Sequence, residues 1–168
     1  MLACTSTMLK GFASSACLTI NSQGRRESHH FRRQNEHLKA GAARLIASLD
    51  ELRSVTNFAK LHALCERRLG LSLQGLGPLY VYDTALNIGA RLGHMPKAVY
   101  LHAGTAEGAA ALGLQGDKTL LMSELPREFQ TLEPYEVEDV LCIYKNQLRD
   151  QSKPPPEKAC RFPEDEAG

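Results

Sequence analysis

The chain has 168 residues, 43% of them hydrophobic, and a formal net charge of +1. This length predicts one compact domain with a modest core, and no apolar run is long enough to span a membrane, so no membrane partner is expected. A chain so close to neutral is not a polycation, and any contact with nucleic acid must come from a local basic patch.

The first half of the chain predicts a disordered leader over residues 1–30, followed by helices. Hydrophobic residues recur at helical spacing over 31–52 and again from about 57 to 69, where Ser54 or Thr56 is the expected N-cap. A third helix is expected from Pro78 to Leu92, with Gly93 ending it. Because this helix is apolar on nearly every side, we expect it to be central and the most buried.

The second half predicts shorter elements. Pro96 is suited to begin a short helix that runs through Leu101; alternatively, residues 99–101 form a strand, which has no obvious partner. A helix of small residues over 106–112, preceded by Gly104, should pack tightly on a neighbour. The last helix begins at Pro134 and carries an apolar stripe to about 148, and residues 151–168 predict a disordered tail. The expected fold is therefore all-α: a small bundle of five to six helices over 31–150, with a helical hairpin at 57–92.

A short turn carries the strongest functional signal. Gly75 and Gly77 flank Leu76 between two expected helices, in the stretch Leu73-Gln74-Gly75-Leu76-Gly77-Pro78-Leu79-Tyr80-Val81. Two glycines permit backbone angles that aim successive N–H groups at an anion, with the positive end of the next helix behind them. A nucleic-acid phosphate is the natural candidate.

This stretch resembles the helix-hairpin-helix motif of DNA-binding domains, whose pattern is L-P-G-h-G-x-x-x-A with h hydrophobic. Gln74 stands at the usual proline and Val81 at the small residue. The resemblance implies that N–H groups near Leu76 and Gly77 bind one phosphate without reading sequence. We expect additional positive charge around the turn from Lys60, Arg67, Arg68 and Arg91.

The resulting interpretation is a non-enzymatic module that binds the DNA backbone independently of sequence, with DNA as partner. An alternative is a protein-interaction or scaffold domain in which the same turn only connects helices. A third is a degenerate DNA glycosylase, because residues 82–93 are similar to V-D-T-H-V-x-R-x-x-x-R-L-G of the endonuclease III class. That resemblance implies Asp83 as the catalytic residue. The hairpin lysine and the four-cysteine loop of that class are missing, so no catalytic residue is assigned.

The cysteines and the other polar clusters predict no cofactor and no metal site. Five scattered cysteines without a CxxC pair favour a reducing compartment, so a cytoplasmic location is expected. Cys65 and Cys142 fit small core positions. His102 stands beside Gly104 without a second catalytic partner, and the acidic residues Glu136, Glu138 and Asp139 fit the first turns of a helix without any metal.

Overall fold

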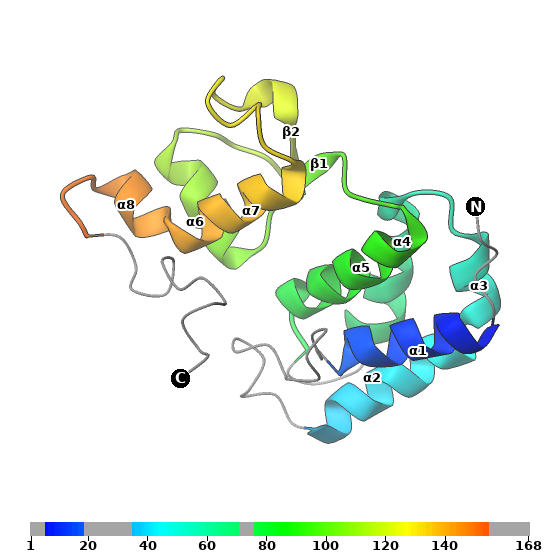
Figure 1. Ribbon diagram of the computed structural model, residues 1–168. Helices are drawn as coiled ribbons and strands as arrows, with labels where there is room; N and C mark the ends of the chain where they lie inside the picture. The colour runs from blue at the N-terminus through cyan, green and yellow to red at the C-terminus, as the bar shows by residue number, and fades with distance from the viewer. Residues whose placement is uncertain (1–5, 19–34, 71–75, 155–168) are drawn as a thin grey trace, which may run out of the picture. The chain divides into compact units, whose positions relative to one another are not determined.

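The computed structural model describes residues 6–18, 35–70 and 76–154 and is mostly helical (Figure 1). The all-α fold class is thereby confirmed. The chain divides into two compact units, Met1–Pro96 and Lys97–Gly168, where the sequence predicted one helical domain over 31–150. The reason is that each part buries a hydrophobic core of its own. None of the described helices has the length and apolar character needed to cross a membrane.

The first unit consists of helices. In chain order they are α1 (Ser6–Cys17), α2 (Asn35–Ala47), α3 (Leu49–Ser54), α4 (Phe58–Cys65), the π-helix η2 (Glu66–Gly70) and α5 (Pro78–Leu92). Helix α1 lies beside α2 and packs on α5, and α4 packs on α5 (Figure 1). Their shared core includes Leu38, Leu45, Leu61, Tyr80 and Ile88, all fully buried.

Helix α1 falls inside the segment that was expected to be a disordered leader. Leu9, Ala13 and Cys17 recur at intervals of four residues and are buried, so they form the stripe by which α1 packs. The Tyr80 hydroxyl donates a hydrogen bond of 2.8 Å to the Cys17 carbonyl oxygen and ties the end of α1 to α5. The structure therefore differs from the expectation over Ser6–Cys17. The expected tail from 155 onward lies outside the described residues.

The helix expected over 31–52 is two helices, because the backbone leaves helical geometry at Ser48 (φ −108°, ψ 26°). The Ser48 hydroxyl donates a hydrogen bond of 3.1 Å to the Arg44 carbonyl oxygen. This bond gives a donor to one of the carbonyl groups at the end of α2. The N-cap of α4 is Asn57, not Ser54 or Thr56, since its side-chain oxygen accepts from the Lys60 N–H at 3.0 Å.

Helix α5 follows the sequence prediction most closely. It begins at Pro78 and ends at Leu92, with Gly93 in the left-handed region at φ 73°, and it contains more buried residues than any other described element. It runs antiparallel to α4 and η2. Gly89 faces Phe58 at the start of α4, whereas Val81 lies beside Gly70 at the end of η2.

The second unit combines helices with a small sheet. Its elements are β1 (Ala98–Tyr100), α6 (Ala103–Ala111), β2 (Thr119–Leu121), the 3₁₀ turn η3 (Met122–Glu124), α7 (Pro134–Ile143) and α8 (Lys145–Arg149). The expected strand has its partner in β2, antiparallel, with buried Val99 opposite buried Leu120. These side chains share a core with Ala109, Val137 and Leu141. The expected last helix is divided into α7 and α8 at Tyr144.

Helices α6 and α7 pack closely, as the small residues of α6 predicted. A Cβ atom placed on Gly108 would lie 2.7 Å from the carbonyl carbon of Leu141 and closer still to its oxygen. A Cβ atom on Gly104 would lie 2.5 Å from the Cys142 sulfur. Both glycines are therefore required by the approach of the two helices.

Candidate nucleic-acid interface

The turn between η2 and α5 is described from Leu76 onward, and Gly75 lies outside the described residues. Leu76 is buried, and Gly77 is the N-cap of α5 with ordinary extended angles (φ −82°, ψ 178°). Open space surrounds the position that a Cβ atom on Gly77 would take. The prediction that the turn requires a glycine conformation is therefore wrong for Gly77, because any residue adopts these angles.

Two of the four basic residues expected around the turn lie at the other end of the helical pair. Arg91 is 14 residues beyond Gly77 on α5, which places it roughly 20 Å along the helix axis. Its guanidinium lies 5.2 Å from the Phe12 ring centre. Lys60 belongs to the first turn of α4, where its ammonium donates to the Thr56 hydroxyl at 3.2 Å. The antiparallel arrangement of α4 and α5 thus separates Lys60 and Arg91 from the turn.

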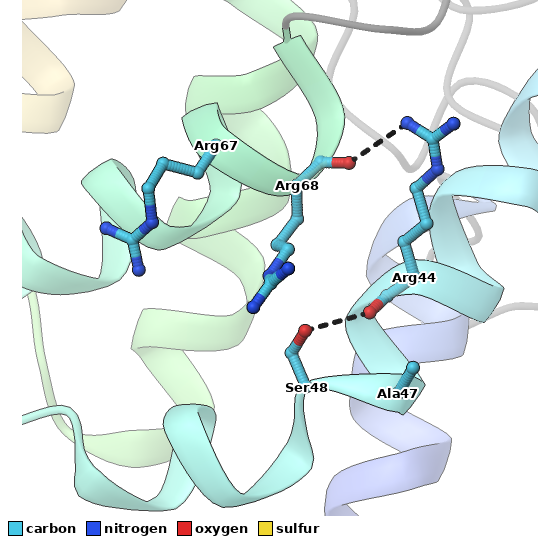
Figure 2. Close-up of a pocket in the computed structure, with 5 residues that line it drawn as sticks. All are labelled: Arg44, Ala47, Ser48, Arg67 and Arg68. Carbon is cyan, nitrogen blue, oxygen red and sulfur yellow. Dashed lines mark hydrogen bonds between the residues drawn. The ribbon is translucent and has the colours of Figure 1, made fainter.

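The other two basic residues, Arg67 and Arg68, are brought together with a third arginine that the sequence reasoning did not select. A pocket of about 370 Å³ is lined by Arg44 and Ala47 of α2, by Ser48, and by Arg67 and Arg68 of η2. Figure 2 shows the Arg44 and Arg68 side chains coming from opposing elements, with Ser48 below them. We call these five residues the arginine pocket.

Local structure explains this convergence. The widened π turn of η2 carries two successive arginines, and such turns occur often at functional sites. An Arg44 guanidinium nitrogen donates to the Arg68 carbonyl oxygen at 3.5 Å, so α2 and η2 meet at the pocket. The Arg68 Nε is buried and has no hydrogen-bond partner among the described residues.

Among the described residues, Glu51 of α3 is an anion that Arg67 and Arg68 contact. Its carboxylate pairs with Arg68 and, at 3.3 Å, with the Arg67 guanidinium. The hydrogen bond from Arg68, followed by its charge and by Arg67, lowers the pKa of Glu51 below its usual value. With three guanidinium groups and one carboxylate, the arginine pocket and Glu51 together have an excess of two positive charges.

Asp83, the residue implied by the glycosylase resemblance, lies in the middle of α5 and is half-buried. Leu79 and Tyr80 occupy the helix start where a hairpin lysine would stand, and Tyr80 is buried. The lysine that the resemblance would require at this end of α5 is therefore missing, and no catalytic role is assigned to Asp83.

A second polar cluster lies in the second unit, and the sequence reasoning missed it. His102 and Glu138 are both buried, with 2.6 Å between the imidazole Nε2 and a carboxylate oxygen. The Thr105 hydroxyl donates to the same oxygen at 2.7 Å. Cys142 belongs to the cluster as well. The sequence did contain a signal for part of this cluster. Glu138 and Cys142 are four residues apart, so they share one face of a helix.

Comparisons of the chain with protein-family models, with curated proteins and with solved structures found no match. Any assignment of function therefore rests on the geometry of the arginine pocket and of the buried cluster.

Proposed function

We propose that the first unit binds the phosphate backbone of nucleic acid through the arginine pocket. The observation that carries this proposal is that Arg44, Arg67 and Arg68 line one pocket. A guanidinium presents a planar set of N–H donors that matches the oxygens of a phosphate, and it stays charged at any physiological pH.

Glu51 supports the same proposal, because it shows that an oxyanion fits between Arg67 and Arg68. A phosphate oxygen would take the place of that carboxylate or bind beside it. Arginine contacts to phosphate position a duplex without reading bases, so binding is independent of sequence. With few such contacts, affinity falls in the range of about 10⁻⁴–10⁻⁶ M that is usual for non-specific complexes.

The competing interpretation is that these arginines only brace α2, α3 and η2. Exposed ion pairs contribute little to stability, because solvent screens them. The side chains of Arg67 and Glu51 are 59% and 44% exposed, so their pair belongs to this class. The two interpretations predict different effects when the arginines are removed. If the arginines only brace the helices, the variant should be less stable. If they bind phosphate, the variant should stay folded and bind nucleic acid more weakly.

A fluorescence-anisotropy titration of the full chain against labelled duplex and single-stranded DNA, at about 50 and 200 mM salt, tests the proposal. The double variant Arg67→Ala with Arg68→Ala should keep its far-ultraviolet circular dichroism and lose about tenfold or more in affinity. Its dependence on salt should also be shallower, because each lost phosphate contact removes about 0.9 from the slope on duplex DNA.

Arg53→Ala is the matched control. Arg53 is an exposed arginine of α3 that pairs with Asp50 at 3.1 Å, so its removal takes away one positive charge and one ion pair, against two of each in the double variant. The control should bind nearly as the parent protein does. Equal loss in both variants would assign the effect to net charge, and no binding at about 50 mM salt would refute the proposal.

The alternative of a protein-interaction or scaffold domain corresponds to one result of the same titration, the absence of DNA binding. Among the described residues, the exposed large hydrophobic side chains are Met8, Leu121 and Ile143, and they belong to three different elements. Such single exposed residues are common on protein surfaces and mark no binding groove. The structure of the described residues therefore favours a charged partner over an apolar one.

A further inference from the structure

We propose that His102, Glu138 and Cys142 of the second unit form a binding site for a divalent transition metal ion, with Zn²⁺ as the best match. One ligand atom from each residue lies within 4.8 Å of the other two. Imidazole nitrogen, carboxylate oxygen and thiolate sulfur are all common zinc ligands in proteins. Their combination suits a borderline-soft cation better than Mg²⁺ or Ca²⁺, which prefer oxygen ligands throughout.

The fold builds this site from two closely packed helices. Glu138 and Cys142 occupy the same face of α7 at positions i and i+4. His102 is the N-cap of α6 and reaches the cluster from the opposite side. Gly104 allows the approach, since a Cβ atom there would lie 2.5 Å from the Cys142 sulfur. Two of the three ligands therefore stand on α7, and the third stands directly before the first residue of α6.

The distances require a small adjustment on binding. Zinc bonds are about 2.0–2.3 Å long, so ligand atoms around a tetrahedral ion are roughly 3.3–3.6 Å apart. The 2.6 Å between His102 and Glu138 is a hydrogen-bond distance, and these atoms must separate by roughly 0.7 Å. The proton of that hydrogen bond and the proton of the Cys142 thiol leave as the metal enters, because metal ligands bind in their deprotonated forms.

Thr105 acts on the site through Glu138. Its hydroxyl donates to Glu138 at 2.7 Å and is fully buried, so it orients the carboxylate in the way that second-layer hydrogen bonds orient metal ligands. Three protein ligands leave one coordination position for water or another small ligand, as in zinc sites that do chemistry. Cys142 is half-buried, whereas His102 and Glu138 are buried.

The test uses Co²⁺ as a spectroscopic probe with the full-length, reduced chain. A tetrahedral site with a cysteine ligand should give one equivalent of bound Co²⁺, with visible d–d bands and a near-ultraviolet thiolate-to-cobalt band. Added Zn²⁺ should displace these bands. Cys142→Ser should fold, because serine is smaller than cysteine at a half-buried position, and it should lose the charge-transfer band. Its zinc affinity should fall by at least about tenfold.

Two further variants make the outcome decisive. The double variant Cys4→Ser with Cys160→Ser, which changes cysteines outside the described residues, should keep the full spectrum. Thr105→Val preserves shape but removes the hydrogen bond to Glu138, and it should weaken zinc binding by about 10–100-fold. Bands that persist in Cys142→Ser, or a parent protein that binds no more Co²⁺ than Cys142→Ser does, would overturn the proposal.

Discussion

Replacing Gly108 with alanine should destabilise the second unit, although helix propensity alone favours the change. Alanine is better than glycine in a helix interior by about 0.8–1 kcal/mol. At this position, however, the added Cβ would lie 2.7 Å from the Leu141 carbonyl carbon, whereas ordinary contacts begin at 3.4 Å. Helix α6 must therefore withdraw from α7 by about 0.7 Å or more, and its buried contacts loosen.

The expected loss of stability is the cost of overpacking less the gain in helix propensity. Overpacking of a close contact costs about 1–3 kcal/mol, which exceeds the propensity gain. We expect a net loss of up to about 2 kcal/mol in the free energy of unfolding, measured by urea denaturation followed by circular dichroism. Amide hydrogen exchange should accelerate in α6 and α7 and stay unchanged in α4 and α5.

Ala110→Gly is the matched control, because Ala110 is exposed on the same helix. It should cost about 1 kcal/mol through propensity alone and leave the contact between α6 and α7 intact. If Gly108→Ala instead stabilised the chain by about 1 kcal/mol, the two helices could not be as close as the structure has them.

Three further substitutions test the arginine pocket, the turn before α5 and the buried Cys17 thiol. Glu51→Gln removes the carboxylate that pairs with two pocket arginines, so DNA affinity in the anisotropy assay should rise roughly threefold at low salt, and a loss would contradict the proposed function. Gly77→Ser adds a capping oxygen in open space and should stabilise α5 by up to about 1 kcal/mol in urea denaturation; a loss of that size would show that the turn needs glycine. Burial raises the pKa of the Cys17 thiol from 9.0 to about 12. The protonated thiol therefore stabilises the fold fully below pH 9, and this stability declines by about 1.4 kcal/mol per unit as the pH rises toward 12. Cys17→Ala should flatten the measured decline between those pH values, and an equal slope in both proteins would contradict this assignment.

The parts of the fold that the sequence predicted are those whose signals are local in the chain. Pro78, Gly93 and a nearly continuous apolar run defined α5 correctly, because a helix start, a helix stop and periodicity act within a few residues of one another. The small residues of α6 likewise predicted its tight packing. The strand β1 was predicted at 99–101 only as an alternative to a short helix and without its partner, since two three-residue strands separated by a helix carry no mutual signal.

The candidate sites could be predicted only in part from the sequence. Arg67 and Arg68 were selected as a basic pair, but Arg44 lies more than 20 positions earlier, and only the packing of α2 on η2 brings it to the same pocket. Lys60 and Arg91 were selected with them, but the antiparallel course of α4 and α5 places them at the far end of the pair.

The sequence by itself determined the helical class, the bounds of α5, the start of α7 and the need for small residues where α6 meets its neighbour. These properties depend on propensity, capping and periodicity, which are local. Tertiary structure alone decided that the chain forms two units, that α1 packs as a helix, and that His102 meets Glu138 and Cys142. These outcomes depend on which surfaces bury one another across long separations in the chain, and that pairing leaves no trace in any single stretch of residues.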